Sequence, residues 1–214
     1  NYPIRRGVVN KNWYQNLELV SNMTKKRGSS FWGFVRIISL NDPSEVISLA
    51  DLKLQTFTNL AYGAQGIQFY RYWTLKDKMF ANGPMSVRGT QSSNYNKLQR
   101  ITSYINNLNS VFMGAHLVQS LHTEQGNGVK RFSKDSMSAF TLSNSKNLLI
   151  TRLQNGRNNY IVFVNKDIRN TNSFTVYPKQ NATFIDKDLK RQNVITGKAF
   201  KAIVQPGDIL IMKY

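Results

Sequence analysis

Hydrophobic residues recur at two different spacings along the chain, and the spacing changes near residue 114. In residues 10–27, 52–61 and 93–112, apolar side chains return every three or four positions, which predicts three amphipathic helices. Between the helices, residues 31–38 (FWGFVRII) form a nearly continuous apolar run, as in a strand buried on both faces, and residues 67–73 predict a second strand. This alternation predicts a parallel α/β arrangement for residues 1–114.

Polar residues and glycines mark the ends of these helices. The first helix ends at Gly28, where basic residues in the last turn suit the helix dipole. Ser48 and Asp51 have the spacing of a capping box at the start of the second helix. A long polar loop, residues 74–92, precedes Ser93, which can cap the third helix. The apolar stripe expected on the first helix consists of Trp13, Leu17, Val20 and Met23.

After residue 114 the pattern changes to short apolar segments separated by turn residues. Asn155-Gly156 lies between two such segments and is a strong hairpin signal. Segments of this length at close spacing predict a small antiparallel β-sandwich in residues 115–214. The expected strands are residues 116–121, 148–153, 160–164, 174–177, 182–185, 198–204 and 209–212. The predicted fold class is therefore α/β followed by all-β.

The composition is strongly basic and lacks cysteine. The 214 residues include 29 Lys and Arg against 11 Asp and Glu, a formal charge of +18 with a pI of about 10.2. Residues 1–110 carry 14 basic and 5 acidic residues and residues 111–214 carry 15 and 6, so each half contributes +9. Because the charge is spread evenly and no nucleic-acid-binding motif is present, we read it as a solvated surface and keep nucleic-acid binding only as an alternative.

Residues 60–73 (LAYGAQGIQFYRYW) are the most informative segment. They predict the end of a helix, a glycine turn at Gly63 or Gly66, and a strand that finishes in aromatic residues. In a strand, Ile67, Phe69 and Arg71 would point to one side and Gln68, Tyr70 and Tyr72 to the other. An end rich in Gln, Tyr and Trp is better explained as the floor of a sugar-binding cleft than as plain core.

FWGF followed by LAYGAQGIQFYRYW resembles the last strands of the barrel in β-galactosidase-like glycoside hydrolases of the (β/α)8 superfamily. The tail is also similar, since residues 148–153, residues 160–167 and Pro206-Gly207-Asp208 resemble the β-sandwich that closes many such enzymes. The resemblance implies the C-terminal portion of a TIM-type barrel, with residues 1–3 as the end of strand six, residues 31–38 as strand seven and residues 67–73 as strand eight. The first five strands would lie in an upstream half of the same protein, and we expect this chain to be a fragment or a processed product.

The resemblance also implies a retaining glycosidase with two carboxylates, about 5–5.5 Å apart, on strands four and seven. The segment that matches strand seven contains no acid, and the nearest carboxylates are Asp42 and Glu45 in the following loop. Asp42 precedes Pro43 and is typical of a turn residue. The catalytic residues are thus unknown, and we expect this chain alone to be inactive.

Sugar-binding residues are predicted from the same resemblance and from their chemistry. Tyr70, Tyr72 and Trp73 can stack on the apolar face of a sugar ring. The sequence offers Arg36 and Gln68 as hydrogen-bond partners for hydroxyls, and the expected end of strand six adds Tyr2. The alternative is that these side chains pack in the core. This alternative is strongest for Gln68, because Gln68 lies farther from the end of its strand.

Other chemistry finds little support in the sequence. His116 and His122 have no partners at metal-ligand spacing, and neither a serine elbow nor a phosphate-binding loop is present, so we expect neither a metal nor a cofactor. No apolar run approaches the length of a membrane span. The absence of cysteine fits a periplasmic or extracellular protein.

Three hypotheses follow from the sequence. The first is the C-terminal part of a glycosidase-like enzyme acting on a β-linked sugar, which contributes part of the cleft. The second is a non-catalytic carbohydrate-binding protein, and the third is a basic nucleic-acid-binding protein motivated only by the charge of +18.

Overall fold

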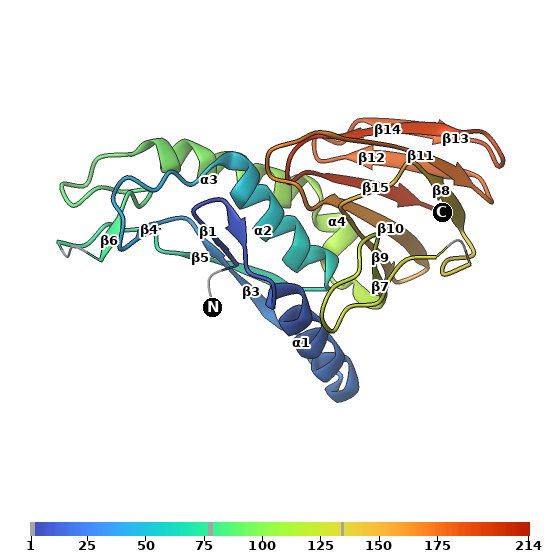
Figure 1. Cartoon of the computed structure of the whole chain (residues 1–214), viewed down its shortest axis with the longest axis horizontal. Coiled ribbons are helices and arrows are strands. Elements are labelled where there is room, and N and C mark those ends of the chain that lie inside the picture. The colour runs from blue at the N-terminus through green and yellow to red at the C-terminus, as the bar shows by residue number, and fades with distance from the viewer. Residues whose placement is uncertain (1–2, 77–78, 134) are drawn as a thin grey trace.

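The computed structural model describes residues 3–76, 79–133 and 135–214 (Figure 1). The N-terminal part alternates helices and short strands, and the C-terminal part consists of strands. The helices are α1 (Trp13–Arg27), α2 (Leu49–Ala61), α3 (Ser93–Asn107) and α4 (Asn109–Phe112). The strands of the N-terminal part are β1 (Ile4–Arg5), β2 (Val8–Val9), β3 (Trp32–Arg36), β4 (Ser39–Leu40), β5 (Gly66–Tyr70) and β6 (Phe80–Ala81). The remaining strands are β7 (His116–His122), β8 (Phe140–Ser143), β9 (Leu148–Asn155), β10 (Asn158–Asn165), β11 (Asn172–Pro178), β12 (Ala182–Asp186), β13 (Arg191–Val194), β14 (Phe200–Val204) and β15 (Ile209–Lys213).

A parallel strand–helix–strand unit forms the centre of the N-terminal part. Strands β3 and β5 pair in parallel, from Trp32 opposite Gly66 to Arg36 opposite Tyr70, and α2 connects them. The predicted parallel α/β arrangement is confirmed for this unit. A closed barrel needs eight strands, and the described residues contain only these two in parallel.

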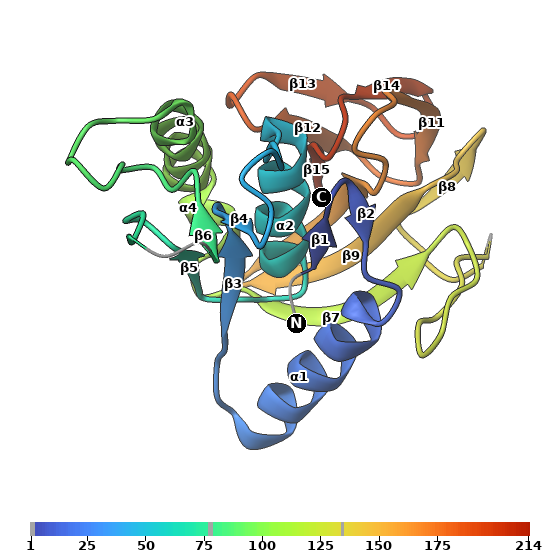
Figure 2. The same ribbon diagram turned by 60° about the vertical axis from the view of Figure 1, so that its left-hand side comes forward.

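Helix α2 begins at the predicted capping box and is buried along almost its whole length. The backbone N–H of Asp51 donates to Ser48 Oγ at 3.0 Å, and the N–H of Ser48 donates to Asp51 Oδ2 at 2.8 Å. The helix lies between β3 on one side and β9 and β10 on the other, with α3 beside it (Figures 1 and 2). Its buried polar side chains therefore need partners inside the protein, and Lys53 and Gln55 find theirs on Asp208 and on the backbone of Arg36.

The C-terminal part is the antiparallel β-sandwich that the turn pattern predicts. One sheet has the order β13-β12-β15-β10-β9-β7 and the other β14-β11-β8. Strands β9 and β10 form the predicted hairpin, whose turn contains Gly156 at a φ of 57°. The rings of Phe140, Phe163 and Phe174 fill the space between the sheets. Strands β8 and β13 were not predicted. The sequence of β13, RQNV, carries no apolar alternation.

One hydrophobic core crosses the predicted boundary at residue 114. It joins apolar residues of α1, α2 and α3 to Leu153, Val162 and Ile211 on the inner sheet of the sandwich. Residue 114 marks a change of local structure just before β7, while the packing continues across it. Helix α2 is therefore buried by residues of both the N-terminal part and the sandwich.

Two expectations about burial are wrong. Trp32 and Phe34 on β3 are 60% and 62% exposed, because no described element covers the face of β3 and β5 opposite α2. On α1 the buried face runs through Trp13, Leu17 and Ser21, so that Val20 and Met23 are 39% and 55% exposed. Both exposed surfaces are apolar and lie on elements whose other faces are packed.

Candidate functional site

The predicted aromatic residues gather at the carboxyl end of β5. Tyr70 ends the strand, the peptide bond to Arg71 is cis, and Tyr72 and Trp73 follow with 47% and 45% of their surface exposed. The ring of Tyr70 contacts Phe80 edge to face, with centroids 5.8 Å apart. Tyr72 and Trp73 are therefore available to a ligand, and Tyr70 is more enclosed.

The loop of residues 74–92 holds Trp73 in place. The N–H of Met85 donates to the carbonyl of Tyr72 at 2.9 Å, and the N–H of Thr74 donates to the carbonyl of Met85 at 2.8 Å. Gly89 lies against the Trp73 ring, where an added Cβ would be 3.8 Å away. The two exposed rings are thus presented by a hydrogen-bonded loop, an arrangement suited to a binding surface.

Gln68 lies on the open face of the parallel pair, opposite Phe34, and is exposed. Within β5 the predicted alternation is confirmed, since Gln68 shares a face with Phe34 while Phe69 faces α2. The prediction also covered Arg71 and Tyr72, but the strand ends at Tyr70. Tyr2 lies outside the described residues. The roles of Gln68 and Tyr2 in binding stay predictions.

Arg36 is buried and engaged at the carboxyl end of β3. Its Nη1 and Nη2 each donate to a carboxylate oxygen of Glu45 at 2.6 Å, and they also reach the carbonyls of Ile38 and Ile4 at 2.9 and 2.7 Å. Only 2% of its side chain is exposed, so Arg36 ties the following loop and the N-terminal segment to the strand. Its predicted role as a ligand for sugar hydroxyls stays a prediction, and the observed contacts serve positioning.

The two carboxylates closest to this strand are occupied by other groups. Burial acts to raise the pKa of Glu45, but hydrogen bonds and charge from Arg36 and the N–H of Arg6 outweigh it and hold the pKa below its ordinary value. Asp42 accepts from the N–H of Ser44 at 3.0 Å and pairs with Arg6 at 3.0 Å, as expected of a turn residue. Neither acid is an open catalytic group in this chain.

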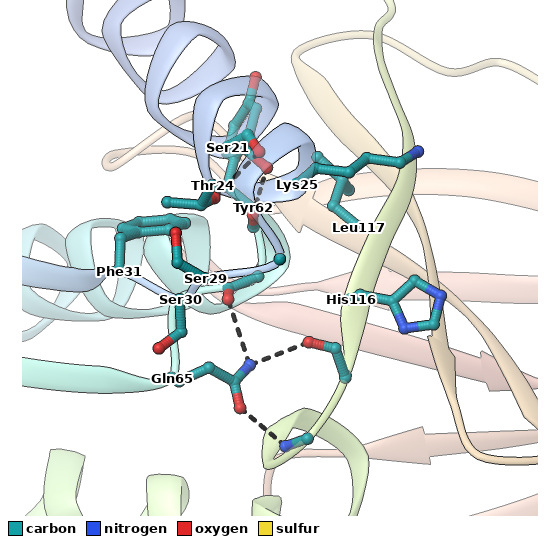
Figure 3. A pocket seen from close by; sticks show the side chains of 14 residues that line it. Ser21, Thr24, Lys25, Ser29, Ser30, Phe31, Tyr62, Gln65, His116 and Leu117 are labelled. Atoms are coloured by element: carbon teal, nitrogen blue, oxygen red, sulfur yellow. Dashed lines mark hydrogen bonds between the residues drawn. The ribbon is translucent and has the colours of Figure 1, made fainter.

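A cavity lies at the opposite end of the parallel strands. It has a volume of about 770 Å³ and lies between the end of α1, the segment before β3, the end of α2 and the start of β7 (Figure 3). Gln65 bridges this region by donating to the carbonyl of Ala115 at 2.9 Å and accepting from the N–H of Gly114 at 2.7 Å. Ligands of parallel α/β folds bind at the carboxyl ends of strands, so the aromatic end is the better candidate.

A buried polar network joins the helices to the sandwich behind this cavity. The hydroxyl of Tyr62 lies 3.0 Å from Glu18 Oε1 and 2.9 Å from His122 Nε2, and Lys166 Nζ lies 3.4 Å from His122 Nδ1. Burial, and then the charge of Lys166, lower the pKa of His122 to about 3, so its ring is neutral. Sequence reasoning missed this network, because Tyr62 and His122 are 60 positions apart.

The described residues were also compared with the requirements of a metal site and of a membrane-spanning helix. No group of three or more His, Asp or Glu residues in the described ranges has the arrangement of a metal site. Among the helices described, none combines the length and apolar character needed to cross a bilayer.

Comparison with known proteins shows a likeness in fold and none in sequence. No protein-family model matches the chain, and no curated protein matches it. A β-galactosidase from Bacillus circulans sp. alkalophilus matches with a TM-score of 0.51 at 6% identity, over 94% of this chain and 58% of that one. A maltogenic α-amylase from Thermotoga neapolitana matches with a TM-score of 0.50 at 9% identity, over 92% and 45% of the two chains.

A GH27 β-L-arabinopyranosidase from Geobacillus stearothermophilus gives the same TM-score of 0.50 at 8% identity, over 95% of this chain and 42% of that one. The chain therefore spans about half the length of these structures, between 42% and 58%. All three are glycoside hydrolases, and the shared arrangement of helices, strands and sandwich extends over most of this chain. The protein has a glycoside-hydrolase-like fold.

Proposed function

We propose that the chain is the C-terminal part of a glycoside hydrolase of the β-galactosidase-like kind that acts on a β-linked sugar. The observation that carries the proposal is the pair of half-exposed rings, Tyr72 and Trp73, at the carboxyl end of β5 in a glycoside-hydrolase-like fold. Aromatic rings in this position offer a flat apolar surface to a sugar. The chain then supplies one wall of the cleft.

The proposal includes an upstream half of the same protein, which would complete the barrel. Two surfaces support it: the open face with Trp32 and Phe34, and the exposed side chains of Val20 and Met23 on α1. Exposed apolar surface is costly in water and is normally covered. Asp42 and Glu45 are both occupied, so the segment that matches strand seven offers no open acid among the described residues, and the carboxylate of strand four would come from that upstream half.

The test is hydrolysis of a panel of aryl β-glycosides by the full-length protein. Trp73→Ala should raise KM by about tenfold, because stacking on one aromatic ring is worth on the order of 1 kcal/mol beyond its buried area. Tyr177→Ala is the matched control, since Tyr177 is 39% exposed on β11 of the sandwich, and it should leave KM unchanged. Failure of the full-length protein on the whole panel would overturn the enzymatic proposal.

A non-catalytic carbohydrate-binding protein is the second candidate. It is favoured by one observation, the absence of an open carboxylate at the carboxyl end of β3, where Glu45 is locked by Arg36. Binding to a glycan array that is lost in Trp73→Ala, together with no hydrolysis, would select this candidate. We further propose a periplasmic or extracellular location, which cell fractionation tests directly.

A further inference from the structure

Arg71 is a cation at the proposed sugar site that no described carboxylate neutralises. Its guanidinium carbon lies 4.9 Å from the centroid of the Phe80 ring, so the planar group is supported by an aromatic face. A guanidinium held in this way by its face keeps its N–H groups, which lie in the plane, free to donate. Arg71 directly precedes Tyr72 and Trp73, so all three belong to one short segment at the end of β5.

Asp42 and Glu45, the described carboxylates in the loop after β3, are already bound by other groups. Asp42 pairs with Arg6, and Glu45 pairs with Arg36. Asp77 and Lys78, which lie outside the described residues, carry opposite charges and cancel in the sum. The charge that remains for a ligand here is positive, from Arg71 and the exposed Lys76.

The same imbalance holds for the chain as a whole. With a formal charge of +18 and five described carboxylates paired with lysine or arginine within the chain, its surface potential favours anions. Such a potential raises the rate at which a charged ligand associates, and a positioned guanidinium gives the contact its geometry, since it matches a carboxylate or sulfate with two parallel hydrogen bonds.

We infer that Arg71, Tyr72 and Trp73 bind a sugar residue that carries a negative charge, as a carboxylate or a sulfate ester. The inference rests on the proposed function and names its substrate class. The rings of Tyr72 and Trp73 contact the apolar face of the sugar, and Arg71 binds its anionic group. A neutral glycan would use the rings alone and would leave the guanidinium without a partner.

The experiment measures binding of the full-length protein to three glycans and to a duplex DNA by calorimetry at low and at physiological salt. The glycans are a β-1,4-linked oligomannuronate, a sulfated β-1,4-galactan and unmodified β-1,4-galactan as the neutral arm. Arg71→Gln should weaken binding of the preferred anionic probe by about tenfold or more, because a hydrogen bond to a charged group is worth about 1.5–3 kcal/mol. Arg71→Lys should recover less for a carboxylate than its charge alone predicts, because lysine lacks the planar fork.

Arg157→Gln is the matched control. Arg157 is exposed in the β9–β10 turn of the sandwich, so its loss removes the same charge at a distant place. Binding of the preferred anionic probe should change less than twofold in this variant. Melting temperatures of both variants near that of the parent show that lost contact with Phe80 has not unfolded the segment.

Each other outcome overturns the inference in a distinguishable way. Equal losses in Arg71→Gln and Arg157→Gln would mean that diffuse charge binds the probe. Equal or tighter binding of a duplex DNA, with the same loss in both variants, would assign the charge to nucleic acid. Preference for the neutral glycan, with loss in Trp73→Ala, would refute the inference and leave the proposed function standing, whereas no glycan binding at all would refute both.

Discussion

Replacing Lys53 with methionine removes one partner of a buried ion pair that connects the two parts of the chain. Lys53 lies on α2, and its Nζ is 2.8 Å from Oδ2 of Asp208 in the turn before β15. The side chains are only 9% and 4% exposed. The opposite oxygen of Asp208 accepts from the N–H of Ile209 at 2.9 Å, so the carboxylate is held in place whatever happens to Lys53.

The magnitude follows from what remains around Asp208. Breaking a buried pair by removing one partner costs about 3–5 kcal/mol, because the other charge stays buried without compensation. Lys187 Nζ, 3.4 Å from the same oxygen, partly compensates the charge, so we expect Lys53→Met to cost about 3 kcal/mol, the lower end of that range. With a urea m-value of about 3 kcal/mol/M, the midpoint of unfolding should fall by about 1 M.

The assay is urea unfolding followed both by far-ultraviolet circular dichroism and by tryptophan fluorescence. Because Trp13, Trp32 and Trp73 all lie in the N-terminal part, fluorescence reports on that part and circular dichroism on the whole chain. The double variant Lys53→Met with Asp208→Asn should lose about 2 kcal/mol less free energy of unfolding than the two single variants lose in sum. Lys187→Met, which removes the more exposed of the two cations, should cost less than Lys53→Met.

Two results would refute this reasoning. A urea midpoint for Lys53→Met within about 0.2 M of that of the parent would mean that the ion pair does not stabilise the packing of α2 against the sandwich. Two separated transitions in the parent, one by fluorescence and one by circular dichroism, would mean that the N-terminal part and the sandwich unfold independently, although they share a core.

Three further perturbations test other features of the structure. Glu45→Gln should cost about 3 kcal/mol in urea unfolding, because the guanidinium of Arg36 loses its buried counter-charge. Asp42→Asn should cost much less, because its partner Arg6 is exposed and solvent screens the pair; equal costs would contradict the assignment. The pKa of His122 is lowered from 6.5 to about 3, so that below pH 6.5 the unfolded chain binds a proton that the folded chain does not. Stability should therefore fall as the pH drops from 6.5 toward 3, and His122→Gln should flatten that fall; unchanged acid unfolding in the variant would remove His122 as its cause. Gly33→Ala places a methyl group on the side chain of Asn59 on α2 and should lower the melting temperature, with a cost of about 2 kcal/mol, and an unchanged melting temperature would show that α2 shifts without penalty.

The sequence was sufficient for features that depend on neighbouring residues. The capping box of Ser48 and Asp51, the glycine end of α1 at Gly28 and the hairpin at Asn155-Gly156 all appear where they were expected. Each of them is decided by hydrogen bonds or backbone conformations within a few positions. The exposed rings of Tyr72 and Trp73 also follow directly from their place in the sequence, immediately after β5.

Which side chains would be buried required the tertiary structure. A periodic apolar pattern shows that a helix or strand has an apolar face, but it does not show whether another element covers that face. Trp32 and Phe34 were expected in the core, and they lie on a face that no described element covers. Lys53 has the sequence context of a surface residue, and it is buried because α2 lies between β3 and the sandwich.

The polar contacts that define the ends of the strands also depended on the fold. Arg36 was predicted to bind sugar hydroxyls, and Glu45 was noted only as one of the carboxylates nearest to the strand; in the structure the two neutralise each other in the interior. Tyr62, Glu18 and His122 meet from three different elements, which no local pattern encodes. The sequence by itself determined the three long helices, the longer strands and the aromatic end of β5, because these follow from local backbone preferences. Only the tertiary structure decided which charges are buried in pairs and which, like Arg71, remain available, because that depends on residues brought together from distant positions in the chain.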